Sequence, residues 1–302
     1  MLSWENLTKR FQHYLKLERS LSENSILAYL QDMEKLQRYM EQQFPDTPPL
    51  QTQLPHLRSF VNSLAALEIS AYTQARIVSG IKAFFRFLMY EDLITEDPAQ
   101  LLETPKLGRR LPDTLSFHEI QSILESIPLG SPEGHRNRAM LEMLYSSGLR
   151  VSELVELKLS HVYADAGFLR IIGKGNKERL VPVGQEALKY LHIYLEEIRV
   201  HMPLVKGHEQ YVFLNRRGKR LTRVMVFLII KKQVEAIGLE KNVSPHTFRH
   251  SFATHLVEGG ADLRAVQEML GHESITTTEI YTHLDRDYLR QVLQEFLPRK
   301  KC

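Results

Sequence analysis

A stretch rich in proline, glycine and basic residues, TPKLGRRLPDTL at positions 104–115, separates two parts of the sequence with different patterns. Proline and glycine interrupt regular secondary structure, and this composition is typical of a linker between domains. The chain has 302 residues, which is more than one hydrophobic core usually organises. We therefore expect two domains, 1–103 and 116–302, joined by a linker at 104–115.

The first part carries apolar residues at spacings of three and four, the period of amphipathic helices. A first helix is indicated around Leu7, and Ser22 is placed to cap a second helix, which the proline-rich break at 45–50 ends. Apolar stripes at 57–67 and 77–88 indicate a third and a fourth helix. The N-terminal part is therefore predicted to be a small helical bundle.

Basic side chains are interleaved on these predicted helices. Taken alone, they are typical of a solvated helix surface that nearby carboxylates balance. They would form a DNA-binding face only if the second domain were an enzyme that acts on DNA. The residues are Lys9, Arg10, Lys16, Arg19, Arg76, Lys82 and Arg86.

Two short segments of the second part have the alternating pattern of β-strands. Residues 168–172 read FLRII and residues 179–183 read RLVPV, and the intervening GKGNKE supplies the glycines of a turn. This pattern predicts a β-hairpin with Lys174 in or beside its turn, and residues 211–222 suggest a second short hairpin. The remaining patterns are helical, so we expect a mainly α fold with a small antiparallel β-sheet.

Arg150 lies at a predicted break between helices. Gly148 ends one helical pattern and a short helix is predicted from Val151. Further helical patterns cover 185–200 and 223–237. An arginine after a helix stop is more often a surface or capping residue than a catalytic one, so Arg150 gains meaning only together with other residues.

The stretch at 244–283 concentrates residues that can act on a phosphodiester. Ser244 suits the cap and Pro245 the first position of a helix, which places His246 and Arg249 on one face near the positive end of the helix dipole. Histidine moves protons near neutral pH, and arginine holds phosphate oxygens in a planar fork. An anion would be favourable at this helix start.

Two more candidates follow along the chain. Gly271 is predicted to end the next helix, which Asp262 can cap, and it leaves His272 just beyond the helix C-terminus. Tyr281 lies on a further short helix, and a tyrosine hydroxyl can act as a covalent nucleophile. Either residue alone would more often be a packed, hydrogen-bonded side chain.

Metal binding is the alternative interpretation of this stretch, because it concentrates five histidines. The two with helical spacing, His246 and His250, enclose threonine, phenylalanine and arginine instead of the glutamate of a zinc hydrolase motif. Arg249 on the same face would also oppose a cation. We therefore expect no metal and no other cofactor. The histidines are His246, His250, His255, His272 and His283.

Composition and charge set broad limits on location and partners. The formal net charge of +3 permits a polyanionic partner without requiring one, and the most apolar run, 224–230, is too short to cross a bilayer. The N-terminus is amphipathic and does not have the pattern of a secretory signal. The single cysteine, Cys302, excludes an intramolecular disulfide and fits a reducing cytoplasm. We expect a cytoplasmic protein without a membrane partner.

Taken together, these motifs resemble those of the tyrosine recombinases, most closely the bacterial Xer site-specific recombinases of the XerD type. The resemblance spans nearly the whole chain, and the ordered set of motifs is far more specific than HxxR alone. The motifs are LSENSILAYLQDM, SSGLRVSELVELKL, GKGNKERLVPVG, HTFRHSFATHLVEGGADLRAVQEMLGH and TTTEIYTHLD.

The resemblance implies a role for each candidate residue. Tyr281 would be the nucleophile, Arg150 and Arg249 would hold the scissile phosphate, and His272 would donate a further hydrogen bond to it. Lys174 matches the hairpin lysine of the family. The resemblance also assigns His246 to the HxxR histidine and Glu153 to a supporting acidic residue.

The resemblance also implies an architecture and partners. A SAM-like helical domain and a C-terminal catalytic domain would clamp a double-stranded DNA recombination site, within a tetramer on two DNA sites built from this chain or from this chain and a Xer paralogue. A septal DNA translocase is a possible regulator. We favour exchange of the apolar tail after 286 into a neighbouring protomer, with packing on its own domain as the alternative. A phage or mobile-element integrase and a non-catalytic DNA-binding protein are the rival functions.

Overall fold

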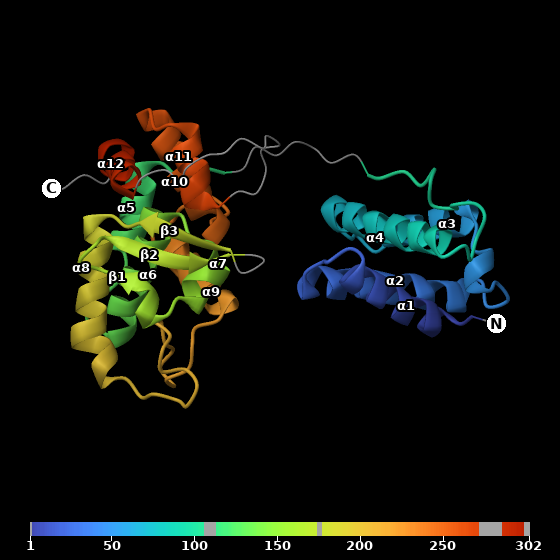
Figure 1. Ribbon diagram of the computed structural model, residues 1–302, viewed down its shortest axis with the longest axis horizontal. Helices are drawn as coiled ribbons and strands as arrows, with labels where there is room; N and C mark the ends of the chain where they lie inside the picture. The colour runs from blue at the N-terminus through green and yellow to red at the C-terminus, as the bar shows by residue number, and fades with distance from the viewer. Residues whose placement is uncertain (1, 106–112, 174–176, 272–285, 299–302) are drawn as a thin grey trace. The chain divides into compact units, whose positions relative to one another are not determined.

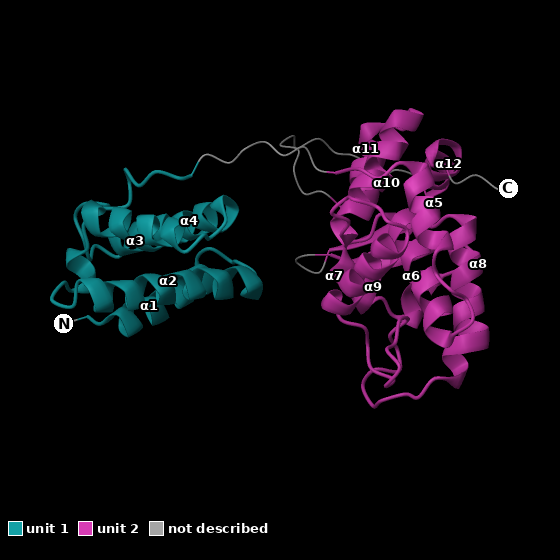
Figure 2. Cartoon of the chain, turned by 180° about the vertical axis from the view of Figure 1, so that it is seen from behind, with its two compact units in different colours: residues 1–110 teal, residues 111–302 magenta. Residues whose placement is uncertain are grey.

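The fold is described from a computed structural model, which covers residues 2–105, 113–173, 177–271 and 286–298. The chain divides into two compact units, residues 1–110 and residues 111–302 (Figure 2). The division falls within the stretch at 104–115 that we interpret as a linker. Each unit has its own hydrophobic core.

Unit 1 is helical in its described residues (Figure 1), and Ser22 caps a helix as the sequence predicts. The Ser22 side chain accepts a hydrogen bond from the backbone amide of Ser25, and Ser70 does the same for Thr73, so both serines satisfy amides that helix starts leave unpaired. The elements are α1 (Trp4–Leu17), α2 (Glu23–Gln43), the 3₁₀ turn η1 (Pro49–Gln51), α3 (Leu54–Ala66) and α4 (Ala71–Tyr90).

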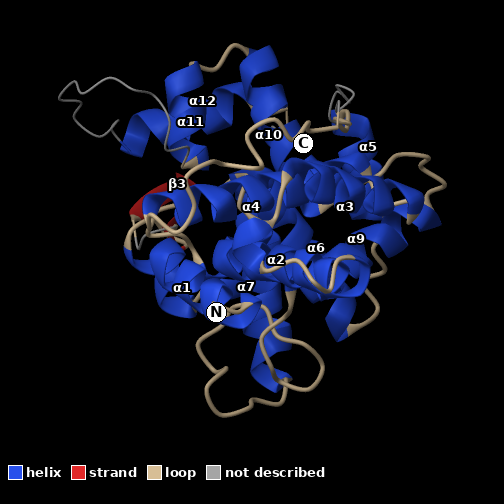
Figure 3. Cartoon of the chain, turned by 90° about the vertical axis from the view of Figure 1, so that its right-hand side faces the viewer, coloured by secondary structure: helices blue, strands red, loops and turns tan. Residues whose placement is uncertain are grey.

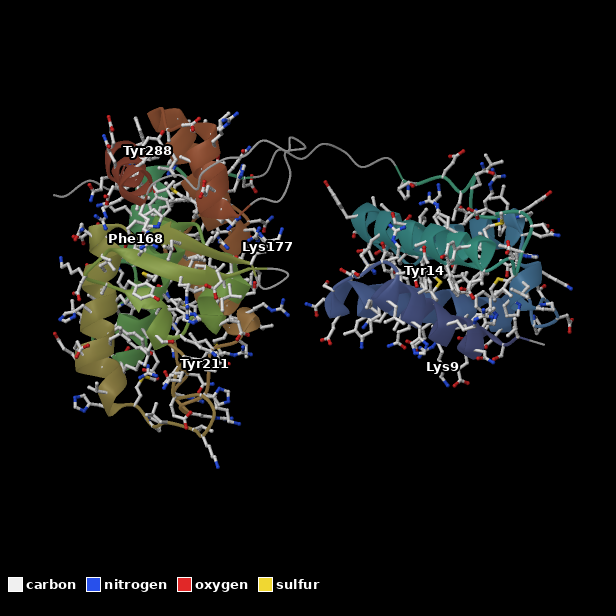
Figure 4. The ribbon with its side chains drawn as sticks, in the orientation of Figure 1. Lys9, Tyr14, Phe168, Lys177, Tyr211 and Tyr288 are labelled. Atoms are coloured by element: carbon white, nitrogen blue, oxygen red, sulfur yellow. The ribbon has the colours of Figure 1, made fainter. Side chains whose placement is uncertain are left out.

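Aromatic side chains fill the centre of unit 1. The ring of Phe11 lies 5.3 Å from that of Phe84, and the ring of Tyr14 lies 5.2 Å from that of Phe87, measured between centroids. Tyr14 lies between α1 and α4 (Figure 4). These edge-on and tilted contacts join the first helix to the last and fix the bundle.

Unit 2 combines short helices with one small sheet (Figure 3). Its main helix, α6, is buried along almost its whole length and packs against α8 and α10. The helices are α5 (Phe117–Glu125), α6 (Pro132–Ser147), α7 (Val151–Glu156), α8 (Gln185–Ile193), α9 (Arg223–Ala236), α10 (Pro245–Gly259), α11 (Leu263–Leu270) and α12 (Arg286–Phe296). The shorter helical turns are η2 (Leu159–His161), the π-helical η4 (Tyr194–Ile198) and η5 (Arg199–His201).

The sheet contains the predicted hairpin and a strand that the sequence pattern does not predict. Strand β2 (Phe168–Ile172) pairs antiparallel with β3 (Glu178–Pro182), and β1 (Val162–Tyr163) adds a short third strand next to β2. Strand β3 begins and ends one residue earlier than predicted. Lys174 lies outside the described residues.

The second predicted hairpin, at 211–222, is confirmed as a reversal of the chain, but neither of its halves is a regular strand. An isolated bridge joins Leu214 to Arg220, and the backbone amides of Leu221 and Asn215 donate across the reversal to the carbonyls of Phe213 and Lys219. The backbone amide of Val212 instead donates to the carbonyl of Leu157. The segment uses its backbone groups to attach to the residues after α7. The hairpin pattern therefore predicted a reversal of the chain but not the partner of its first half.

Helix α12 packs on its own unit, against α10, α11 and β3. Leu289, Val292 and Leu293 are buried there, and the guanidinium of Arg290 lies 5.0 Å from the ring centroid of Phe168 at the start of β2. In the single chain the tail therefore packs on its own domain, which is the alternative to the exchange that we favour. Exchange into a neighbouring protomer stays a prediction about an assembled tetramer.

Candidate active site

Arg150 is the N-cap residue of α7, directly after the turn that ends α6. Its backbone amide donates to Oε2 of Glu153 at 2.8 Å, and its guanidinium donates to Oε1 of the same carboxylate at 2.9 Å. The side chain of Arg150 is 37 % exposed, whereas that of Glu153 is 5 % exposed. A buried carboxylate therefore orients an arginine that remains accessible to an anion.

Arg249 reaches the same region from the second turn of α10. Ser244 caps this helix as predicted, with its hydroxyl accepting from the amide of Thr247. The Arg249 guanidinium donates to the carbonyl oxygens of Gly148 and Leu270, both at 2.6 Å. Burial and the nearby charge of Arg150 lower the pKa of Arg249 to about 10, so the guanidinium stays charged at neutral pH.

The C-terminal end of α11 joins the two arginines to a third. The carbonyls of three consecutive residues, Met269, Leu270 and Gly271, accept hydrogen bonds from Arg179, Arg249 and Arg150, respectively. Carbonyls at a helix C-terminus have no partner within the helix and form the negative end of its dipole, so they suit cationic donors. One helix end thus gathers arginines from α7, β3 and α10.

A cavity of about 500 Å³ opens beside Arg249. His246 and His250, one turn apart on α10, both line it, as their spacing predicts, and both are exposed. Asp113 and Leu270 contribute to the remaining wall. The cavity brings an arginine and a histidine of the HxxR motif to one surface that a phosphate could reach.

Sequence reasoning missed Arg179. This residue is on β3, directly after Glu178, and its Nη1 and Nη2 donate to Oε1 and Oε2 of Glu153 at 2.8 and 2.9 Å. Its side chain is 13 % exposed. The available signal was a cation placed within an apolar strand pattern, because a buried arginine requires a partner.

The structure does not reach every candidate. Lys174, His272 and Tyr281 lie outside the described residues, so the site as described consists of Arg150, Arg249, His246 and the supporting Glu153 and Arg179. Within the described ranges no group of three or more histidine, cysteine or acidic side chains is arranged to hold a metal.

His255 has a structural role instead of a ligand role. Its Nδ1 lies 2.8 Å from the hydroxyl of Tyr145, in the contact between α10 and α6. Burial lowers the pKa of His255, which favours the neutral ring. This histidine does not belong to the candidate metal set that its position in the sequence suggested.

Several basic residues of unit 1 have acidic partners on the same unit. Lys9 pairs with Glu5 at 2.7 Å and Arg76 with the buried Asp32 at 2.6 Å. Arg10 pairs with Glu91. The pairs of Lys9 and Arg10 agree with the interpretation of a solvated helix surface that carboxylates balance, whereas the partner of Arg76 is buried. Lys82 and Arg86 of α4 differ, because they line a broad groove with His56 of α3.

Comparisons with known proteins agree with both units. The family model described as "Phage integrase family" matches residues 113–287, and the model described as "Phage integrase, N-terminal SAM-like domain" matches residues 8–92. The chain belongs to the phage integrase family, the class of the tyrosine recombinases.

Within that class the chain is similar to proteins named tyrosine recombinase XerD. The XerD of Chlorobaculum tepidum is 42 % identical over 299 residues, which are 98 % of this chain and 97 % of that protein. A crystal structure of XerH site-specific recombinase bound to palindromic difH substrate, a post-cleavage complex, has a TM-score of 0.70 at 25 % identity and covers 94 % of this chain and 83 % of that one.

The fold also extends to a more distant integrase. A crystal structure of a lambda integrase tetramer bound to a Holliday junction has a TM-score of 0.71 at 19 % identity and covers 94 % of this chain and 81 % of that one. At this identity the likeness shows the fold alone. The two family models confirm the SAM-like and catalytic parts of the predicted fold class. No helix among the described residues is both long and apolar enough to cross a membrane.

Proposed function

We propose that this chain is a site-specific tyrosine recombinase that cuts and rejoins double-stranded DNA and resolves chromosome dimers at cell division. The observation that carries the proposal is the convergence of Arg150 and Arg249 on neighbouring carbonyls at the end of α11, directly before His272. The full-length similarity to XerD proteins supports the same conclusion.

In the proposed reaction, the oxygen of Tyr281 attacks the scissile phosphorus. The bond from phosphorus to the 5′ oxygen breaks, and the products are a 3′-phosphotyrosyl link and a free 5′ hydroxyl. The reverse attack by a 5′ hydroxyl of another strand restores the phosphodiester and frees the tyrosine. Because the phosphotyrosyl link conserves the energy of the phosphodiester bond that breaks, no ATP is needed.

Each remaining candidate has a chemical task. Arg150 and Arg249 stabilise the charge that develops on the equatorial phosphate oxygens. Tyrosine has an ordinary pKa of about 10, so its proton needs an acceptor, for which we propose His246. Lys174 would protonate the leaving 5′ oxygen, and His272 would donate a further hydrogen bond to the phosphate.

The proposed assembly is a tetramer on two DNA sites in the cytoplasm, formed with further copies of this chain or with a Xer paralogue. Unit 1 would bind DNA together with unit 2, and Lys82 and Arg86 are its candidate contacts. A septal DNA translocase is a candidate regulator of the assembly.

The test is covalent trapping on a nicked duplex that carries the site selected by the full chain from a random-sequence library. Wild type should form an adduct that survives denaturing electrophoresis, with and without EDTA, and Tyr281→Phe should bind the duplex without forming it. Tyr288→Phe is the matched control, because Tyr288 is an exposed tyrosine on α12 and should leave the adduct unchanged (Figure 4).

The outcomes separate the rival functions. An adduct in Tyr281→Phe would overturn the nucleophile, and strict dependence on a divalent ion would restore the metal interpretation. Binding without any adduct in wild type would indicate a non-catalytic DNA-binding protein. A selected site that matches the end of a mobile element instead of a chromosomal site would indicate an integrase.

A further inference from the structure

Arg179 contacts a supporting carboxylate and a helix end that both adjoin the candidate catalytic residues. Its two terminal nitrogens form a bidentate pair with Glu153, and its Nε donates to the carbonyl of Met269 at 3.0 Å. Three of the five N–H donors of the guanidinium are engaged in these bonds. The planar fork of arginine fits this arrangement, and the ammonium of lysine does not.

The carboxylate of Glu153 is fully occupied. Each of its oxygens accepts one bond from Arg179 and one from Arg150. Arg179 therefore supplies the counter-charge that Glu153 would otherwise take from Arg150 alone. The cluster of Arg150, Glu153 and Arg179 therefore has a net positive charge, whereas Arg150 and Glu153 alone would be neutral.

The electrostatics of Glu153 agree with this division of roles. Burial acts to raise the pKa of Glu153, but the hydrogen bonds and charge of Arg179, followed by the bonds from Arg150, more than offset it and hold the pKa below its ordinary value. The carboxylate thus remains ionised in a buried place, where an unpaired charge would be costly.

Position separates Arg179 from the arginines that would hold the phosphate. Its side chain is 13 % exposed, compared with 37 % for Arg150. Arg249 is also buried, but it lines the cavity beside His246, whereas neither Arg150 nor Arg179 is among the lining residues. Arg179 is thus neither exposed like Arg150 nor at the cavity like Arg249. In the sequence, Arg179 follows Lys174 by five positions, and its partner on α11, Met269, precedes His272 by three.

We propose that Arg179 is a positioning residue that holds Glu153, and through it Arg150, in place for the phosphate while it fixes the hairpin to the end of α11. This inference rests on the proposed recombinase function. Arg179 itself does not touch the DNA. Loss of Arg179 should therefore lower the rate of the covalent step and leave DNA affinity nearly unchanged.

The experiment compares wild type, Arg179→Gln and Arg150→Gln on two nicked duplexes of the library-selected sequence. One duplex has an ordinary scissile phosphate, and the other has a methylphosphonate, in which a methyl group replaces one charged oxygen. Arg179→Gln should slow adduct formation on the phosphate roughly 10- to 100-fold, with duplex Kd within about threefold of wild type. On the neutral methylphosphonate, which depends less on Arg150, both variants should lose much less.

A matched control isolates the effect of disrupting a buried ion pair. Arg138, in the first half of α6, is 8 % exposed at its side chain, pairs with Glu142 at 3.0 Å and donates to the carbonyl of Leu124. Arg138→Gln should lower stability like Arg179→Gln but keep the rate of adduct formation. If Arg179→Gln does not fold, Arg179→Lys replaces it, because lysine retains the charge next to Glu153 but not the bidentate fork.

The outcomes distinguish the inference from the function on which it rests. If wild type forms no adduct on the phosphate duplex, the recombinase function fails and the inference fails with it. If wild type reacts and the Arg179 variant either matches it or loses the same factor on both duplexes, the inference alone is overturned. A weakened Kd as the main effect would make Arg179 a DNA contact and would also overturn it.

Discussion

Arg249 donates a 2.6 Å hydrogen bond to the carbonyl oxygen of Gly148, the residue whose left-handed conformation ends α6 two positions before Arg150. The bond joins α10 to the turn that carries the other arginine, so one phosphate-binding candidate fixes the backbone next to the second. The geometry of the pair therefore depends on the turn at Gly148 as well as on the two side chains.

The first prediction concerns this turn. Gly148 has a φ of +56°, and a Cβ there would lie 2.4 Å from the ring of Phe252. Gly148→Ala should lower the free energy of unfolding by about 1–3 kcal/mol through overpacking, measured by urea denaturation, and should slow adduct formation. Gly238→Ala is the control, since Gly238 also has a positive φ but open space around it. Equal effects of the two variants on adduct formation would contradict the prediction.

The second prediction separates the two arginines by burial. Arg150→Lys and Arg249→Lys should both lose adduct formation severely, because lysine presents a point charge in place of a planar fork. Only Arg249→Lys should also destabilise the chain, by about 1–3 kcal/mol, since lysine cannot reach both carbonyls that the buried guanidinium joins. Rates from single-turnover cleavage and midpoints from denaturation provide the two measurements. A wild-type rate in either variant would count against phosphate binding by that arginine.

Local signals in the sequence predicted much of the fold. Ser22, Ser244 and Gly148 were assigned correctly as two caps and a helix end, because capping depends on a few neighbouring residues. The hairpin followed from strand alternation and a glycine-flanked turn. By contrast, the short strand β1 and the attachment of the 211–222 segment depend on partners distant in sequence, which periodicity does not reveal.

The candidate site shows the same limit. The types and local spacing of His246 and Arg249 indicated phosphate chemistry, and a family resemblance added Arg150 and Glu153. Arg179 was missed because its partners are distant in the sequence. Glu153 lies 26 positions away, and Met269 at the end of α11 lies 90 positions away. The three arginines bind one helix end through tertiary contacts, which local spacing in the sequence does not indicate.

The third prediction uses the pKa of Glu153, which is held below its ordinary value of 4.5. A carboxyl whose pKa is lower in the folded than in the unfolded state contributes stability above the ordinary value and loses it as pH falls through the lowered folded value. The difference in free energy of unfolding between wild type and Glu153→Gln should therefore be constant above about pH 5.5 and shrink below pH 4.5. Urea denaturation at a series of pH values measures it. A difference that grows with acid would show that the carboxylate is not stabilised in this way.

The last prediction concerns α12, which packs against α10, α11 and β3 of its own unit. Leu293 of α12 is 3 % exposed within its own unit, so Leu293→Ala should lower the free energy of unfolding by about 2–5 kcal/mol. Gln294→Ala, at the exposed neighbouring position, should change it by less than about 0.5 kcal/mol. Because the contacts lie within one chain, the loss should be the same at every protein concentration. A loss that appears only at concentrations where the chain assembles would mean that α12 is buried by a neighbouring protomer. In that case, truncation after Asp287 should weaken the synapsis of two DNA sites more than it weakens binding to one site.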